Sequence, residues 1–275
     1  MRYTMLQLFL AQRVNADDLF AILPPRQTRQ EYLETTFSKE MRFDYWKHPF
    51  VFKPFRSPED GYVVGVIAKE HKVTVAGPPE EGFAAKQVED WDTANLLIDS
   101  RTTQLAAMQQ GAVGQPLQII KALIDHINEN LKTSEWIIEV NPVTTKEEFW
   151  TIADRYKGHI AEVDLSFAVP NIWGGQSETE KALNELKNEN NAQEVEVKIK
   201  NKDGQLNPDT ERVRSSVDYI TKGGGTVRLR DDTQTTIYSS ENEENAVTTP
   251  VDPDFPVQEA DDGMIASLIK RLFNK

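Results

Sequence analysis

The chain has 275 residues, of which 39% are hydrophobic and 27% charged, and its formal net charge is −13 at pH 7. It contains no cysteine, which excludes a disulfide framework, a thiolate zinc site and a cysteine nucleophile. No stretch reaches the roughly 18 consecutive apolar residues of a membrane span, and the apolar run at the N-terminus is too short for a signal peptide. We therefore expect a cytoplasmic protein.

Charge is unevenly distributed along the chain. Residues 1–80 contain 11 Lys and Arg against 10 Asp and Glu, a balance of +1, which leaves 20 against 34, or −14, for residues 81–275. A partner with a phosphate backbone would prefer the N-terminal third, because its affinity depends on local positive charge. The acidic remainder is more simply explained by solubility alone.

The first 110 residues have the turn signals and β-branched runs of a β-rich domain. They predict a strand at 3–10, a short helix from Asn15 to Pro24, a hairpin of Gly61–Ala68 and Val73–Ala76 with its turn at Lys69–Lys72, an acidic loop at 79–92, and a second hairpin of Leu96–Asp99 and Gln104–Met108.

The stretch Met41–Arg56, MRFDYWKHPFVFKPFR, interleaves aromatic and basic side chains. Proteins that bind single-stranded nucleic acid use this combination, because bases stack on aromatic rings and phosphates pair with cations. The candidate nucleic-acid-binding residues are Arg42, Lys47, Lys53 and Arg56. The alternative is a half-buried hairpin with its basic residues pointing to solvent and its aromatic residues in the core, namely Phe43, Tyr45, Phe50 and Phe52.

Residues 111–240 alternate between helical and strand patterns. The expected order is a helix from Pro116 to Leu131, a strand at 135–140, a helix from Thr145 to Tyr156, a strand at 160–169, a helix at 177–190, a strand at 194–200, a helix at 208–221 and strands at 226–230 and 236–238. This order predicts an α+β fold in which a split-βαβ, ferredoxin-like domain over residues 111–240 follows the β-rich domain over residues 1–110.

The end of the chain changes character after Tyr238. Residues 241–260 are acidic and contain several prolines, so we expect a loosely held linker. Residues 261–275 predict an amphipathic helix whose apolar face consists of Met264, Ile265, Leu268, Ile269, Leu272 and Phe273. Such a face must dock on something, and packing on its own chain competes equally with binding to another chain, ahead of a membrane surface.

Catalytic and metal-binding patterns are weak throughout. The four histidines are scattered, and Gly223–Gly225 follows a helix where a phosphate loop would precede one. Glu196 and Lys198 fit the strand of a metal-dependent nuclease, with Asp164 as the further carboxylate. Strict alternation of charged and apolar residues along that strand is the simpler explanation, because any strand with one solvated face has this pattern. We therefore predict no catalytic residues, no metal and no cofactor.

Four segments of the later half, PLQIIKALIDHINENLKTSEWIIEVNP, HIAEVDLSFAVPN, EVEVKIKNKDGQLNPD and ITKGGGTVRLRDD, carry a family resemblance. In their order and spacing they resemble the RexA type of phage-exclusion protein over about residues 96–244. The resemblance implies a DNA-binding sensor subunit of an abortive-infection system, a homodimer that acts through a second, effector protein.

The sequence thus predicts a non-enzymatic anti-phage defence sensor or regulatory subunit that binds nucleic acid or a phage component. It would reach a membrane only through its partner. Two alternatives stay open: a metal-dependent nuclease that uses the strand of Glu196 and Lys198, and a protein-interaction subunit that docks through its acidic surface and tail helix.

Overall fold

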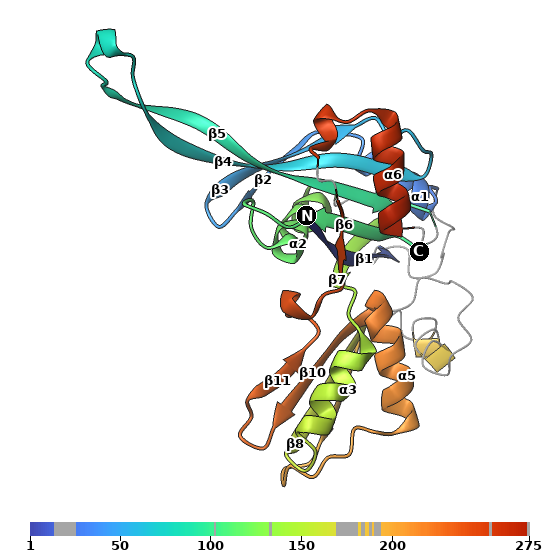
Figure 1. Ribbon diagram of the computed structural model, residues 1–275. Helices are drawn as coiled ribbons and strands as arrows, with labels where there is room; N and C mark the ends of the chain where they lie inside the picture. Colours follow the sequence, from blue (N-terminus) through green and yellow to red (C-terminus); the bar gives the residue numbers. More distant parts are fainter. Residues whose placement is uncertain are drawn as a thin grey trace.

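The computed structural model describes residues 1–13, 26–101, 103–131, 134–168, 181–182, 185–186, 189, 194–252 and 255–273. The fold is mixed α/β, with one sheet of eight strands and another of four, which we call the large and the small sheet (Figure 1). The helices expected near residues 15–23 and 177–190 lie wholly or largely outside the described residues.

The large sheet is antiparallel in each of its pairings. Its strands follow the order β12-β1-β6-β5-β4-β3-β2, and β7 also pairs with β1. Their bounds are Thr248–Pro250 (β12), Arg2–Gln12 (β1), Leu105–Gln109 (β6), Ala85–Asp99 (β5), Tyr62–Ala76 (β4), His48–Phe55 (β3), Met41–Tyr45 (β2) and Trp136–Pro142 (β7). The predicted hairpin of Leu96–Asp99 and Gln104–Met108 is confirmed, since Leu96–Ile98 pairs with residues 106–108.

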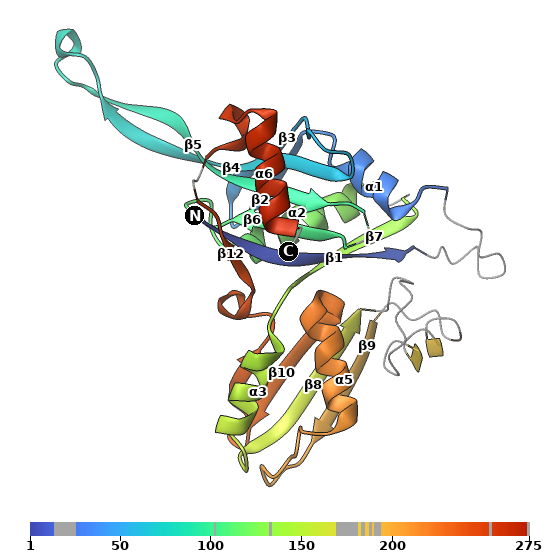
Figure 2. The same ribbon diagram turned by 45° about the vertical axis from the view of Figure 1, so that its right-hand side comes forward.

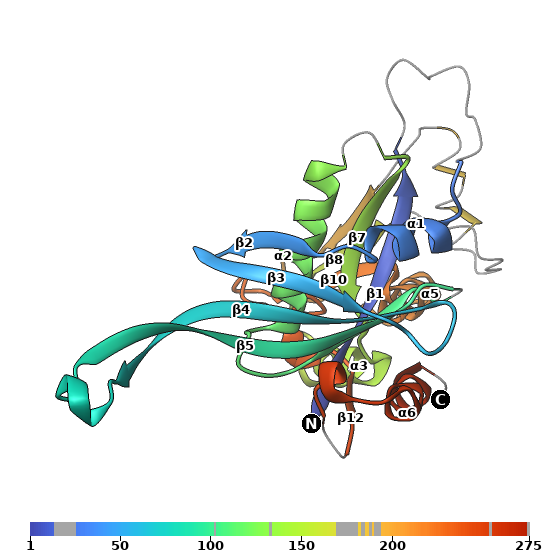
Figure 3. The same cartoon turned by 90° about the horizontal axis from the view of Figure 1, so that it is seen from above.

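Helices cover both faces of the large sheet because its strands alternate in polarity. Leu6, Leu8 and Leu10 of β1 point to one face, where α1 (Arg29–Thr36) and α2 (Pro116–Asn130) complete the core. Tyr3 and Met5 point to the opposite face, which α6 (Asp262–Phe273) covers (Figure 3).

The acidic segment before α6 is held in place, which corrects the expectation of a loose linker. Its residues Thr248–Pro250 extend the edge of the large sheet beside β1, and Val251 and Val257 are buried under α6. Asn95 on the sheet accepts a hydrogen bond from Val257 N at 3.2 Å and donates one to the carbonyl of Phe255 at 2.9 Å. Apolar residues spaced among the acids therefore fix the segment.

The small sheet has the order β11-β10-β8-β9, with bounds Thr236–Ser239, Gly225–Asp231, Ile160–Ala168 and Glu194–Lys200. Helices α3 (Lys146–Arg155) and α5 (Glu211–Tyr219) lie on one face of it and share its core. Strands β9 and β10 are joined through α5 and flank β8, the arrangement of a split βαβ unit. Gly225 is required where β10 starts, because a Cβ there would lie 2.0 Å from the Ser166 carbonyl oxygen.

Strand β7 does not belong to the small sheet, which corrects the expected ferredoxin-like order and its boundary at residue 110. It pairs with Leu6–Gln12 of β1, and its inward residues Trp136, Ile138 and Val140 pack in the same core as α2. The chain crosses to the small sheet after β7 and returns before β12 (Figure 2). The two crossing segments touch, since Val247 N donates a hydrogen bond to the Val143 carbonyl at 2.7 Å.

The hairpin of β4 and β5 is longer than predicted, and the expected turn at Lys69–Lys72 and loop at 79–92 are wrong. Both strands run for 15 residues and meet at a turn over residues 77–84. Two lysines of β4 lie opposite acidic residues of β5, with Lys69 facing Asp92 and Lys72 facing Glu89. Beyond the rest of the sheet the hairpin continues as a two-stranded projection, Glu70–Trp91, which we call the arm (Figures 1 and 3).

Candidate functional site

The aromatic and basic stretch Met41–Arg56 forms the β2–β3 hairpin at the edge of the large sheet. Phe43, Phe50 and Phe52 are buried in the core and Tyr45 is half-buried, as the alternative interpretation predicted. The four candidate basic residues, Arg42, Lys47, Lys53 and Arg56, are all exposed.

The structure brings together two of these four basic residues. Arg42 and Lys53 point to the α6 face of the sheet and line an open groove of about 430 Å³, which we call the sheet groove. Its lining residues are Glu40, Arg42, Val51, Lys53, Phe55, Val66, Ala68, Trp91, Thr93 and Gln258. The strand register explains why these residues line one groove. Residues opposite one another in successive strands are Arg42, Val51, Ala68 and Thr93.

The sheet groove combines cations with flat apolar surfaces. The Arg42 side chain is 80% exposed, with its Nε 3.6 Å from Glu40 Oε1. The Nζ atom of Lys53 lies 6.0 Å from the centre of the Phe55 ring. Trp91 is 39% exposed at the other side of the groove. Such a site can hold an anionic group beside a planar ring.

Lys47 and Arg56 lie elsewhere. Lys47 and Trp46 form the β2–β3 turn, and Trp46 is 81% exposed. Both residues have positive φ angles, 64° at Lys47 and 49° at Trp46. That conformation is unfavourable for side chains larger than glycine or asparagine. Arg56 lines a second pocket of about 360 Å³ with Phe37 and Tyr62 among its walls. The four predicted residues therefore do not form one patch.

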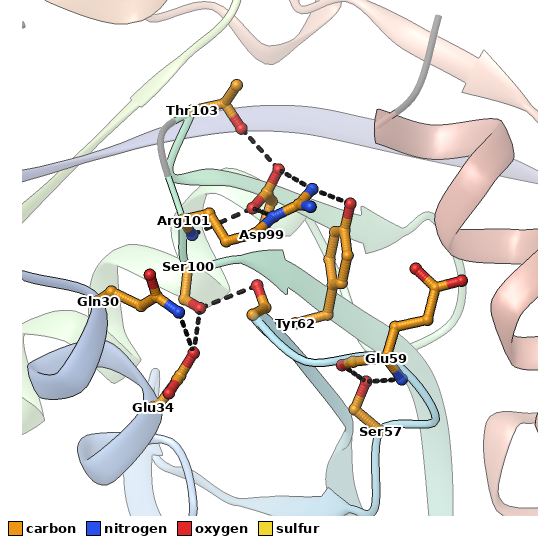
Figure 4. A network of polar contacts seen from close by, with 10 residues as sticks. Gln30, Glu34, Ser57, Glu59, Tyr62, Asp99, Ser100, Arg101 and Thr103 are labelled. Atoms are coloured by element: carbon orange, nitrogen blue, oxygen red, sulfur yellow. Dashed lines mark hydrogen bonds and ion pairs between the residues drawn. The ribbon is translucent and has the colours of Figure 1, made fainter.

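A polar network borders this second pocket (Figure 4). The buried Asp99 carboxylate accepts hydrogen bonds from Arg101 Nε at 3.0 Å and from Thr103 Oγ1 at 2.9 Å. This carboxylate raises the pKa of Arg101 above its ordinary value, mainly through the hydrogen bond. The Arg101 guanidinium also lies 4.2 Å over the Tyr62 ring and donates to its hydroxyl.

The same network reaches helix α1. Ser100 Oγ lies 2.9 Å from both Glu34 Oε1 and the Gly61 carbonyl, and Gln30 donates to the same Glu34 oxygen at 2.9 Å. Because Asp99 and Glu34 are engaged by neighbouring donors, neither is placed to act as a general base. The network fastens the β5–β6 loop to α1.

The strand proposed for nuclease chemistry has ordinary cross-strand ion pairs. Lys198 Nζ lies 3.2 Å from Asp164 Oδ2, whereas Glu196 is exposed opposite Ser166. Lys200 likewise pairs with Glu162, at 2.9 Å. Among the residues that the structure describes, no three histidine or acidic side chains are grouped so as to hold a metal ion. Cross-strand ion pairs on one face of the sheet, one of them to the buried Glu162, account for these residues.

The apolar face of the tail helix is covered by the chain itself, which corrects its assignment as a partner-binding surface. Ile265, Leu268, Ile269 and Leu272 are buried against the large sheet. Phe273 is half-buried, with its ring 5.7 Å from that of Tyr62, and only Met264 is exposed. No helix in the described ranges is long and apolar enough to cross a membrane.

Two features of the β4–β5 hairpin were missed by sequence reasoning. Trp91 lines the sheet groove, although its segment was expected to be a loop. His71 lies between two carboxylates, 3.5 Å from Asp90 and 3.4 Å from Asp92. The signal was present in the complementary charges of the segments Lys69–Lys72 and Glu89–Asp92.

Comparison with known proteins found no matching family model, no similar curated protein and no similar solved structure.

Proposed function

We propose that this protein binds single-stranded nucleic acid in the sheet groove without transforming it. The observation that carries the proposal is the convergence of Arg42 and Lys53 with Trp91 and Phe55 on one open face of the large sheet. Cations provide contacts for phosphates, and the aromatic rings provide stacking surfaces for bases. Single strands fit such a surface because their base faces are accessible, whereas a duplex hides them.

The groove favours a polymer over an enclosed small molecule. Its volume of about 430 Å³ is at the lower end for a small-molecule pocket, and it lies open on the sheet surface. An open site of this kind leaves room for a polymer to continue beyond it. Seven of the groove's ten lining residues, including both cations, belong to the near-neutral N-terminal third of the chain.

The biological setting of the proposal comes from the resemblance to the RexA type. In that setting the protein is a cytoplasmic sensor or regulatory subunit of an anti-phage system, and it acts as a homodimer through a partner effector. The partner alone would bring it to a membrane. The nuclease alternative has no supporting geometry among the described residues, and the tail helix offers its partner-binding face to its own core.

The proposal is tested by fluorescence anisotropy with labelled oligo(dT) and oligo(U) over a series of salt concentrations. The double variant Arg42→Ala/Lys53→Ala should weaken binding at least about tenfold and reduce the slope of log K against log salt by about 1.4, because about 0.7 is expected for each phosphate contact on a single strand. Trp91→Ala should weaken binding by about 1–3 kcal/mol through lost stacking.

The matched control is Lys47→Ala/Arg56→Ala, which removes the same charge from the same stretch of sequence but outside the sheet groove. It should change the affinity less than about twofold. Equal weakening by the two double variants would show that binding is not located in the groove. Absence of binding by the unmodified protein at low salt would contradict the proposed function itself.

A further inference from the structure

Among the residues that the structure describes, no strand pairs with the outer edges of the arm. Strand β3 accompanies β4 only as far as Lys69, and β6 pairs with β5 only at Leu96–Ile98. The seven pairs from Glu70 opposite Trp91 to Ala76 opposite Ala85 therefore form a ribbon of two strands within the described structure. An isolated ribbon of this kind is marginally stable in water, and its free backbone edges tend to pair with another strand.

One face of the arm also carries exposed apolar side chains, beside His71, Lys86 and Asp90. Val73 lies opposite Val88, and the neighbouring Val75 lies on the same face. Val75 is 43% exposed, Val88 is 46% exposed, and Phe83 in the tip is 64% exposed. Exposed apolar side chains grouped on a projecting element are typical of a surface that binds another protein.

The backbone of β5 shows which of its residues can pair outward. Asn95 N is directed away from β4, since it donates to the Gln109 side chain at 2.7 Å. Trp91 is four residues from Asn95, so its N–H has the same outward direction, and it donates to the Asp90 side chain (Oδ1) at 2.9 Å. Odd-numbered residues of β5 therefore direct their backbone groups to the free edge.

The sequence of this edge, Ala85–Trp91 (AKQVEDW), is complementary to itself in charge. When a second copy is aligned antiparallel about Val88, Lys86 lies opposite Asp90 of that copy, and symmetry produces the pair twice. Gln87 then lies opposite Glu89 of the second copy. Because both residues direct their backbone N–H and C=O groups to the free edge, they can form hydrogen bonds between the two copies. The apolar pair of Val73 and Val88 also becomes continuous with the same pair of the second copy.

We propose that a second copy of this chain binds along the outer edge of β5, so that two arms form one four-stranded antiparallel sheet. The opposite edge, β4, fits less well. Antiparallel alignment of β4 about Val73 places Glu70 opposite Ala76 and Lys72 opposite Thr74, and creates no ion pair. Alignment about His71 would place Glu70 opposite Lys72, but it would also bring the second copy against Lys69, which already pairs with β3. The twofold relation between the copies gives a closed dimer. This inference does not depend on any ligand in the sheet groove.

The first test is the mass of the full chain in solution, measured by light scattering and sedimentation at several concentrations without nucleic acid. The unmodified protein should be a dimer. Lys86→Asp places like charges opposite each other twice and should weaken dimerisation about tenfold or more. The double variant Lys86→Asp/Asp90→Lys should restore it. Lys202→Asp, which makes the same change of charge at an exposed position just after β9, should not weaken it.

The second test fixes the register. The natural chain has no cysteine, so Val88→Cys introduces a single thiol. Residues opposite each other in a non-hydrogen-bonded antiparallel pair have Cα atoms about 4.5 Å apart, within disulfide range. Val88→Cys should therefore form a cross-linked dimer on mild oxidation, and Val73→Cys should remain uncrosslinked.

Three results would overturn the proposal. A monomer at every concentration would remove the second copy as the occupant of the edge. A cross-linked dimer in the Val73→Cys variant, with none in the Val88→Cys variant, would place the interface on β4. A dimer that neither cysteine variant cross-links, and that Lys86→Asp leaves intact, would place it away from the arm.

Discussion

Glu139 is a carboxylate held in an unfavourable environment. It lies half-buried on β7, and burial raises its pKa above the ordinary value, with a further contribution from Glu194 at the start of β9. The folded protein therefore binds this proton more tightly than the unfolded chain does. Stability consequently falls as pH rises from the ordinary pKa of glutamate through the raised pKa, and the deficit persists at neutral pH.

Glu139→Gln should stabilise the protein at neutral pH, because the amide has no charge to desolvate. The gain in melting temperature should shrink as pH falls and vanish below the ordinary pKa of glutamate, where both side chains are neutral. Thermal unfolding of both proteins across this pH range measures the difference. Glu147→Gln, at an exposed position of α3, controls for the loss of one surface charge. A gain that is equal at all pH values would contradict the explanation.

At the same scale, part of the candidate site could be predicted from the sequence. Arg42 and Lys53 were identified because cations interleaved with aromatic residues form a local pattern. Trp91 could not be identified, because its place in the groove depends on the register of β4 with β5 and of β3 with β4. Which basic residues share the groove depends on strand alternation: Arg42 and Lys53 face α6, whereas Lys47 lies in the turn.

Among the elements, α6 contributes directly to the core of the protein. Leu268 is 2% exposed and packs on the large sheet, whereas Met264, on the same helix, is 38% exposed. Leu268→Ala should lower the free energy of unfolding by about 2–5 kcal/mol, through lost burial and the cavity that remains. Met264→Ala should stay within about 0.5 kcal/mol of the unmodified protein.

Urea unfolding monitored by circular dichroism measures both variants. A loss of oligomeric state in Leu268→Ala, with unchanged stability of each subunit, would instead support the helix as a docking element. The apolar face of α6 was predictable from its periodicity. Its target was not, because a helical stripe does not specify which surface covers it.

The arm and the acidic segment show why other elements were missed. Charges clustered in Lys69–Lys72 have the composition of a turn, yet they pair across the hairpin with Glu89–Asp92. Acidic residues in 241–260 have the composition of a linker, yet Val251 and Val257 fasten it to the sheet. In both cases the deciding interactions join residues that are distant in sequence.

At the scale of the whole molecule, the strand β7 was assigned to the wrong sheet. It alternates in the same way as the strands of the small sheet, and alternation specifies a face without specifying a neighbour. Its true neighbour, β1, precedes it by more than a hundred residues. The general order of strands and helices could be predicted from the sequence, whereas their division between the two sheets could not.

Residues 144–246 leave and rejoin the large sheet at adjacent points, next to the hydrogen bond between Val247 N and the Val143 carbonyl. Replacing them with two or three glycines should leave the large sheet folded, because β1, β7, β12 and α6 all remain. The expected result is a cooperative unfolding transition and nucleic-acid affinity within about twofold of the full chain. A shortened protein that is soluble but lacks a cooperative transition would show that the large sheet depends on the small one.

The same arrangement determines the order in which the protein can fold on the ribosome. The small sheet and its two helices are contiguous in sequence, so all their described parts have emerged before β12 is made. The large sheet contains β1 but is completed only by β12, and one of its faces is covered only by α6. Three contacts form only after the later segments have been made: β1 pairs with β12, the amino group of Met1 donates to the Val251 carbonyl at 2.7 Å, and α6 covers one apolar face of the sheet. Until α6 has been made, that apolar face is uncovered, which exposes the nascent protein to aggregation.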